Sequence, residues 1–422
     1  MTTTNSFADW AVKNATLMRH FGFDADLDEL EPLREVIGDA RVVALGECSH
    51  HVRQFYQVRH RILRFLVERC GFTVYALEAP FTEARVLDAW LTGGPGEVGA
   101  IAGAGIAASL GDSPDLHDAL TWMRSRNTIG THPRLSCVGT DLPGCAGSPL
   151  TALQAVEPYL RDTDPEALPV LRRAAGIAAR FHVGDLVKAL GRYPLVDAAD
   201  RDALSAALSH LVVRAERAAS LHRDRAREHS AILHHLRGAW YVDQVHRSTL
   251  VDGFEAASTF RDAYIAQSVR RLLDESPSGT RIVLSAHNWH IRKTTEDNGG
   301  PTPLLPAGYH LNAMLGDGYR AIGLTNGTGD TAIAAPSQTD PETIAFRRAP
   351  LPEPVDGSIE AAFDDRAPWQ LADLNAARAE VSDAEAYTKA RMADYFLDDR
   401  AFDAFDAVAY VHRTTVTAHA DH

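Results

Sequence analysis

The feature that most constrains the fold of this chain is a set of short, nearly continuous apolar runs, each flanked by turn residues. A strand with one face in water alternates apolar and polar residues, whereas continuous apolar runs are typical of strands covered on both faces by helices. We therefore predict an α/β protein with a largely parallel sheet flanked by helices. The six predicted strands are residues 41–46, 72–77, 135–139, 281–286, 319–324 and 405–411.

The segments between these runs have helical spacing. Residues 52–66 place apolar side chains on one helical face, so the first two strands and this helix form a βαβ unit with a right-handed crossover. From 150 to 273, Ala, Leu, Arg and Asp recur at helical intervals. We predict an α/β core built from 1–149 and 274–422, with 150–273 as a helical insertion that walls or covers a cleft.

Two further segments carry local predictions. Residues 335–354 are rich in proline and are predicted to form turns, whereas 383–395 (DAEAYTKARMADY) is predicted to form a helix.

Composition excludes several classes of protein. No apolar stretch in the 422 residues reaches the roughly 18 residues that a membrane span needs, and residues 1–14 lack the pattern of a secretory signal. We expect a soluble, cytoplasmic protein, monomeric by default.

The four cysteines of the chain, Cys48, Cys70, Cys137 and Cys145, form no C-x-x-C pair and are expected to be reduced and not to bind zinc. The net charge of −14 and the dispersed arginines disfavour nucleic acid and anionic membranes and favour a small-molecule partner.

Ionisable side chains follow four of the predicted strands. The first strand leads to Glu47 and His50, the second to Glu78, the third to Asp141, and the fourth to His287, Asn288 and His290. Because the carboxyl ends of parallel strands share one edge of a sheet, where ligands bind, these side chains are predicted to converge.

Each of these residues also has a purely structural interpretation. Glu47 or His50 alone would cap the following helix, Asp141 in GTDLPG is slightly better explained as a turn residue, and an isolated histidine belongs to the core or the surface. A carboxylate after an apolar strand, such as Glu78, needs a cation or hydrogen-bond donors. Two histidines and two glutamates at the ends of three strands together favour a functional site.

Arg59 lies within the apolar stripe of the predicted helix 52–66. Helical side chains lean toward the N-terminus, so its guanidinium is expected to reach Glu47, Glu78 or a substrate oxyanion. The alternative is an arginine that extends to solvent at the helix edge.

The motifs LGECSHH, QVRHRILRFL, GFTVYALEAPF and SAHNWHI, in this order, resemble those of the erythromycin esterase superfamily. The similarity continues through GTD at Asp141, FRDAYIAQSV, GYRAIGLTNGTGD and FDAVAYV, and so spans nearly the whole chain. The resemblance implies an α/β core with a deep cleft, and a hydrolase that opens a macrolactone ester with water, without a metal or other cofactor. By motif, it implies that His50 activates water with Glu47, Glu78, His287 and Arg59 as catalytic partners, and that His290, Asn288, Asp141 and Arg261 support or bind the substrate, a macrolide or another natural product.

This chemistry is reasonable without the resemblance. A histidine whose pKa lies near neutrality can accept a proton from water, and Arg59 or a protonated His287 could stabilise the oxyanion. The chain has no G-x-S-x-G motif, and Ser49 lacks the strand–turn–helix context of a serine nucleophile, which favours water as the nucleophile.

Three alternatives stay open. A biosynthetic relative would use the same acid–base groups for cyclisation, acyl transfer or elimination. A metal-dependent hydrolase would use Glu47, His50, Glu78, Asp141, His287 and His290 as ligands. A binding module would hold a ligand in the cleft without turnover.

Overall fold

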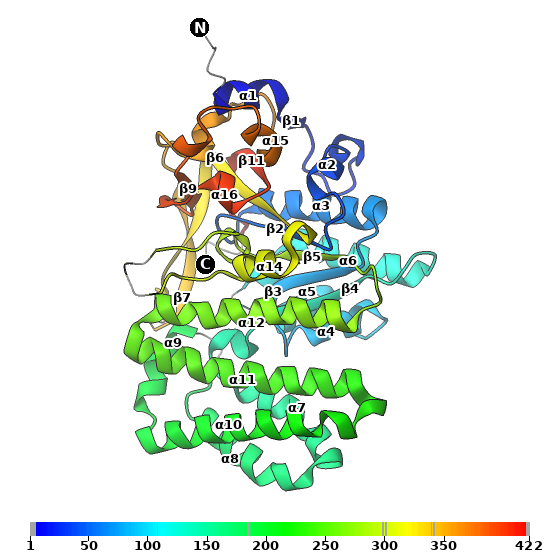
Figure 1. Cartoon of the computed structure of the whole chain (residues 1–422), viewed down its shortest axis with the longest axis vertical. Coiled ribbons are helices and arrows are strands. Elements are labelled where there is room, and N and C mark those ends of the chain that lie inside the picture. The colour runs from blue at the N-terminus through cyan, green and yellow to red at the C-terminus, as the bar shows by residue number, and fades with distance from the viewer. Residues whose placement is uncertain are drawn as a thin grey trace.

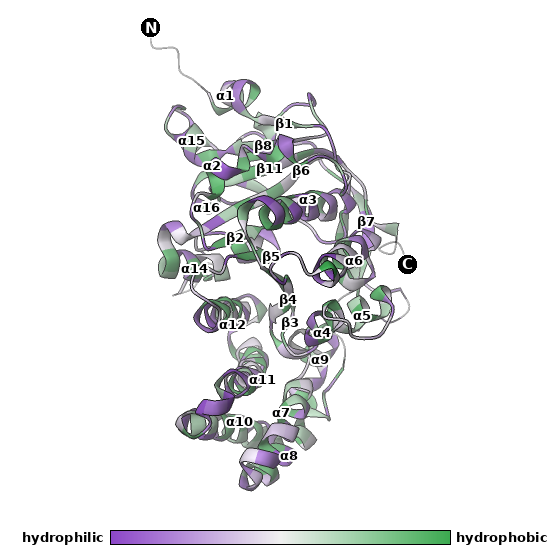
Figure 2. Cartoon of the chain, turned by 90° about the vertical axis from the view of Figure 1, so that its right-hand side faces the viewer, coloured by the Kyte–Doolittle hydropathy of each residue, from purple (hydrophilic) through white to green (hydrophobic). Residues whose placement is uncertain are grey.

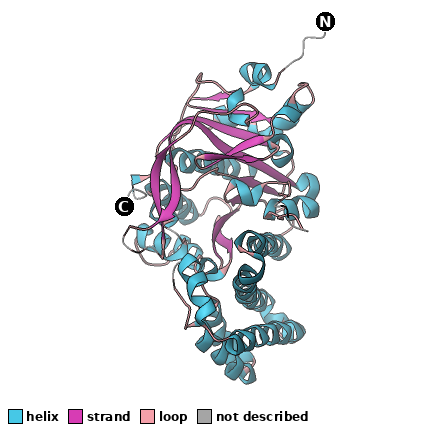
Figure 3. Cartoon of the chain, turned by 90° about the vertical axis from the view of Figure 1, so that its left-hand side faces the viewer, coloured by secondary structure: helices cyan, strands magenta, loops and turns pink. Residues whose placement is uncertain are grey.

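The computed structural model describes residues 6–418 except 108, 184–185, 298, 300–301, 339 and 341, and the side chains of 145 and 146. Nine strands form one mixed sheet, in the order β1-β8-β11-β6-β2-β5-β3-β4, with β7 paired to β6 (Figures 1 and 3). Their bounds are β1 Thr16–Met18, β2 Val42–Leu45, β3 Val74–Pro80, β4 Ser136–Asp141, β5 Ile282–Ser285, β6 Tyr319–Pro336, β7 Ile344–Pro350, β8 Trp369–Asp373 and β11 Ala407–Thr414.

The predicted α/β class is confirmed. All six predicted strands are present, and β11, β6, β2, β5, β3 and β4 are parallel to their neighbours in this row. The antiparallel pairs join β1 to β8, β8 to β11 and β6 to β7.

Both faces of the parallel strands are buried, which explains the continuous apolar runs. In β2, Val43 and Leu45 belong to one hydrophobic cluster, while Val42 and Ala44 belong to another on the opposite face. The first cluster includes α2 Leu33–Ile37, α3 Arg53–Cys70, α4 Arg85–Leu91, α5 Val98–Gly105 and α6 Pro114–Ile129. The second includes α1 Phe7–Asn14, α12 Phe254–Glu275, α13 Asn288–Ile291, α14 Ala307–Leu315, α15 Leu374–Arg378 and α16 Ala401–Ala404. Figure 2 shows α3, α5 and α6 on one side of the sheet and α12 and α14 on the other.

The region predicted as an insertion is largely helical. Its helices are α7 Leu150–Thr163, α8 Leu168–Ala178, α9 Leu186–Arg192, α10 Ala198–Ala218 and α11 Ala226–Asp252, followed by α12. Side chains of α7, α8, α10 and α11 form a separate hydrophobic cluster, and these helices lie beyond α12 as seen from the sheet (Figure 1). In α12, Ile265 and Val269 pack with the sheet. The helix thus links the two regions, and the domain boundary near 273 stays a prediction.

Two local predictions are wrong. Much of the segment 335–354 is not turn but strand, because β7 pairs with the end of β6 from Asp330 opposite Pro350 to Pro336 opposite Ile344. The segment 383–395 is not a helix: after a short 3₁₀ turn at Ala384–Ala386 it forms β9 Lys389–Met392, which pairs with β10 Tyr395–Asp398. Sequence periodicity failed here because pairing partners outside the segment stabilise the extended backbone.

Searched over its described residues, the chain has no helix long and apolar enough to cross a membrane. Cys48, Cys70 and Cys137 are free thiols, while the side chain of Cys145 lies outside the described part.

Candidate active site

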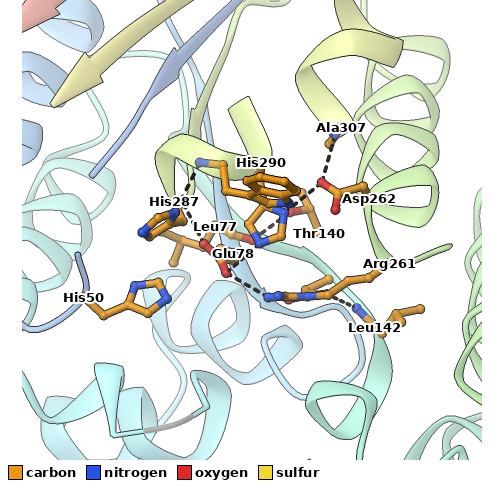
Figure 4. Close-up of polar contacts among 12 residues, drawn as sticks. His50, Leu77, Glu78, Thr140, Leu142, Arg261, Asp262, His287, His290 and Ala307 are labelled. Atoms are coloured by element: carbon orange, nitrogen blue, oxygen red, sulfur yellow. Dashed lines mark hydrogen bonds and ion pairs between the residues drawn. The ribbon is translucent and has the colours of Figure 1, made fainter. Parts of the chain in front are cut away.

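The carboxyl ends of β2, β5 and β3 lie level with one another, and this alignment brings the predicted site residues together. Leu45 of β2 and Leu77 of β3 are both paired with Ser285 of β5. The residues that follow meet above the strand ends, so that the ring centroids of His50 and His287 lie only 5.2 Å apart although the residues are 237 positions apart (287 − 50). Figure 4 shows both imidazoles beside Glu78.

His50 is held by Glu47, which is in turn held by Arg59. The Nδ1 atom of His50 lies 2.9 Å from Oε1 of Glu47, and the Arg59 guanidinium lies 2.9 Å from Oε2 of the same carboxylate. Glu47 and Arg59 are buried, whereas 23% of the His50 side chain is exposed. The expectation that Arg59 pairs with a site carboxylate is therefore met.

The contact with Glu47 fixes how His50 can carry protons. Because a carboxylate only accepts hydrogen bonds, Nδ1 of His50 carries a hydrogen, and in the neutral imidazole Nε2 is left with the lone pair. Burial lowers the pKa of His50, but the hydrogen bond and charge of Glu47 outweigh it and raise this pKa above its usual value. Burial raises the pKa of Glu47, yet Arg59 and His50 together keep it below the usual range.

His287 has the opposite character. Burial, and then the charge of His50, lowers the pKa of His287 to about 3, so its imidazole is neutral near pH 7. Its Nδ1 accepts the backbone N–H of Trp289 at 3.2 Å and caps α13, which leaves the hydrogen on Nε2. This lowered pKa argues against a protonated His287, one of the two oxyanion donors considered from the sequence, although its Nε2–H can still donate a hydrogen bond.

Glu78 lies at the centre of a buried ionic network (Figure 4). Its Oε2 accepts the backbone N–H of His287 at 2.7 Å, and its Oε1 lies 2.8 Å from Arg261 and 3.3 Å from Nε2 of His290. Burial raises the pKa of Glu78, but the charges of His290 and Arg261 hold it well below its usual value. Arg261 of α12 also contacts both oxygens of Asp141 through its Nε, at 2.9 Å each. Asp141 is therefore part of the network rather than only a turn residue.

Asp262 is a site residue that the sequence did not reveal. Its Oδ1 lies 2.8 Å from Nδ1 of His290 and also accepts the backbone N–H of Ala307 at 2.8 Å (Figure 4). It directly follows Arg261 in the FRDAYIAQSV segment, and two adjacent opposite charges ahead of the apolar positions of this helix were the available signal.

His290 makes the folded protein sensitive to alkaline pH. Burial lowers the pKa of His290, but the charges of Asp262 and Glu78 raise it to about 10. Because the folded-state pKa exceeds the unfolded value of about 6.5, the stabilisation is complete below pH 6.5 and is lost as the pH rises toward 10. We expect the free energy of unfolding to fall by about 1.4 kcal/mol per pH unit within this range. In urea titrations between pH 6 and 10, the free energy of unfolding of His290→Gln should fall less steeply with pH than that of the wild type. Equal pH dependence in the two proteins would contradict the assignment.

Asn288 and Phe346 lie next to the two histidines of the site: Asn288 follows His287 in the chain, and Phe346 contacts His50. The amide of Asn288 donates to the carbonyl of Leu324 and accepts its N–H, so it ties α13 to β6, and its predicted contact with substrate stays a prediction. Phe346 of β7 packs against His51 and His50, with ring centroids 4.3 Å and 6.2 Å away. The sequence missed Phe346 because its segment was assigned to turns.

Two observations concern the metal and serine alternatives. Within the described ranges, no group of three or more His, Cys, Asp or Glu side chains is arranged to hold a metal ion. The hydroxyl of Ser49 is buried and donates to the carbonyl of Ala332 at 2.8 Å, which turns it away from a nucleophilic role.

Comparison with known proteins gives consistent matches. The erythromycin esterase family model matches residues 67–414. The chain is 31% identical over 351 residues to an erythromycin esterase type II of Escherichia coli, covering 81% of this chain and 82% of the relative, and 26% identical over 311 residues to a type I enzyme of Escherichia coli, covering 71% and 73%. A solved structure of an erythromycin esterase mutant in its open conformation has the same fold, with a TM-score of 0.80 and 23% identity over 97% of this chain and 100% of that one.

Proposed function

Because the chain belongs to the erythromycin esterase family, we propose that it hydrolyses an ester of a macrolactone or a similar natural product, with water as the nucleophile. The observation that carries this proposal is the exposed edge of His50, held by buried Glu47 and facing neutral His287 at 5.2 Å between ring centroids. The family model match starts at residue 67, so the roles of Glu47, His50 and Arg59 rest on this geometry.

His50 acts as the general base. Neutral His50 takes a proton from water on Nε2 as the water oxygen attacks the ester carbonyl carbon, and Glu47 stabilises the imidazolium that forms. Arg59 keeps Glu47 ionised and oriented. The raised pKa of His50 makes it a stronger base than an ordinary histidine.

His287 donates to the developing oxyanion. Its Nε2–H is a neutral donor in a largely buried position, where a fixed hydrogen bond stabilises new negative charge more than it would in water. The imidazolium of His50 then returns the proton to the leaving alkoxide as the C–O bond breaks. One water is consumed, and the products are a carboxylic acid and an alcohol.

The ionic network around Glu78 holds His287 in place. Glu78 fixes the backbone of His287, and Arg261, His290 and Asp141 fix Glu78. We propose that the helical region 150–273 walls the cleft and selects the substrate, and that the enzyme acts as a cytoplasmic monomer.

Incubation of the purified protein with 14-membered macrolides in H₂¹⁸O tests the proposal. We expect a product that gains the mass of one labelled water and carries ¹⁸O in the new carboxylate. A product of unchanged or lower mass would instead indicate the biosynthetic alternative, binding without product would indicate a binding module, and activity abolished by chelation and restored by a divalent ion would indicate a metal-dependent hydrolase.

A further inference from the structure

A small cavity is lined by the pair formed by Glu47 and Arg59. Its volume is about 40 Å³, and it is lined by residues of β3, the end of β5 and α3, and by Ile106, Leu110 and Leu116. Figure 2 shows α3 and α6 on the same side of the sheet. The cavity also borders Glu78, so two carboxylates of the site, Glu47 and Glu78, belong to its lining.

Four polar atoms in this lining have no hydrogen-bond partner among the described residues: Oε2 of Glu47, the hydroxyl of Tyr56, Nε of Arg59 and Nε2 of His60. Each belongs to a side chain no more than 5% exposed. Oε2 of Glu47 meets Arg59 at 2.9 Å as an ion pair but without hydrogen-bond alignment. Buried polar atoms are rarely left unpaired in folded proteins, so a concentration of four around one cavity points to a ligand.

The arrangement follows from the sequence of α3. Tyr56, Arg59 and His60 are spaced i, i+3 and i+4, which places them on one face of the helix. The Arg59 guanidinium lies 5.1 Å from the centroid of the Tyr56 ring, so the cation is held between this ring and Glu47.

The mixture of donors and acceptors identifies the ligand as water. Glu47 accepts, Arg59 donates, the Tyr56 hydroxyl does both, and Nε2 of neutral His60 accepts or donates according to the tautomer of the ring. Burial and the charge of Arg59 lower the pKa of His60 to about 3, which keeps it neutral. An anion would meet Glu47 and a cation would meet Arg59, whereas water can donate to the first and accept from the second. A cavity needs at least about 10–15 Å³ to hold a water, so this one has room for more than one.

We propose that this cavity is a built water site, and that Tyr56 and His60 are positioning residues that hold water against Glu47 and thereby set the proton affinity of His50. Glu47 uses Oε1 for His50, while its Oε2 has no aligned hydrogen bond and Glu47 is part of the cavity lining, so Oε2 is the atom left for water. Water that donates to Oε2 withdraws negative charge from the carboxylate and weakens its hold on the His50 proton. The water site itself does not depend on the reaction, whereas its effect on turnover rests on the proposed function.

Two measurements on the full chain test this proposal. In a crystal structure of the substrate-free protein we expect ordered water within about 3.2 Å of the Tyr56 hydroxyl and of Nε2 of His60. In Tyr56→Phe we expect this water to be weakened or lost, and the pKa of His50 to rise by half a unit or more. NMR of ring-labelled histidine, with His50→Asn used to assign the resonance, gives that pKa without any substrate.

The matched control is Tyr75→Phe, since Tyr75 lines the same cavity but its hydroxyl already pairs with Ser285. We expect the pKa of His50 to be unchanged in this variant, and the acid limb of kcat/KM to move only in Tyr56→Phe. A wild-type cavity that is dry or filled by a rotated side chain would overturn the proposal, as would an unshifted His50 in Tyr56→Phe. If the NMR shift appears without any ester turnover, the water site stands and only the proposed function fails.

Discussion

Replacement of His50 by Asn is expected to lower kcat/KM for ester hydrolysis by about 10²- to 10⁴-fold, the range typical of a lost general base. Asparagine keeps a hydrogen-bonding group near Glu47 but cannot accept a proton from water at neutral pH. Because 23% of the His50 side chain is exposed and it fills no core position, the fold should survive. Steady-state kinetics give the effect, and circular dichroism checks the fold.

The wild-type pH profile tests the same assignment. The pKa of His50 is raised above its usual value of 6.5, and only its neutral form can act as a base. We therefore expect kcat/KM to fall as the pH drops through an apparent pKa above 6.5, and this limb to be absent from the residual activity of His50→Asn. His132→Asn, which changes an exposed histidine, should leave both rate and profile unaltered. Activity in His50→Asn within threefold of the wild type would remove His50 from the mechanism.

The sheet could be predicted from sequence because its central strands carry a two-sided apolar pattern. In β2, alternate side chains pack into two different hydrophobic clusters, so every position is apolar. The same topology made the site predictable, since parallel strands bring Glu47, Glu78 and His287 to one edge. Arg59 was recognised because an arginine on a buried helical face requires an anion, and Glu47 supplies it.

What the sequence did not reveal depends on contacts between distant segments. β7 forms because β6 offers it a partner, and this hairpin brings Phe346 against His50. The pairing of Asp262 with His290 and the neutrality of His287 arise from burial in three dimensions, which no local pattern encodes. For the same reason, the sequence could not show that Nδ1 of His287 accepts the backbone N–H of Trp289, which leaves the hydrogen on Nε2.

Replacement of Arg261 by Met should strongly lower the free energy of unfolding. Arg261 is the cation between Asp141 and Glu78, both of which are largely buried. Removing one member of a buried ion pair typically costs about 3–5 kcal/mol, and we expect about 3 kcal/mol here because 31% of the Arg261 side chain is exposed. Activity should fall as well, because Glu78 would no longer hold the backbone of His287 in place.

The pH dependence of the free energy of unfolding shows whether Arg261→Met loses a charge interaction or only packing. In the wild type the pKa of Glu78 is depressed, so its contribution to stability is complete above about pH 4.5 and is lost as the pH falls. The difference in the free energy of unfolding between the wild type and Arg261→Met should therefore narrow in urea titrations below pH 4.5, where Glu78 loses its charge. Arg261→Lys should recover part of the stability, while Arg270→Met on the same helix, whose ion pair with Asp274 is exposed, should change it by less than about 1 kcal/mol. If the difference in the free energy of unfolding instead stays constant with pH, Arg261 contributes through packing. Only an electrostatic contribution disappears when Glu78 loses its charge.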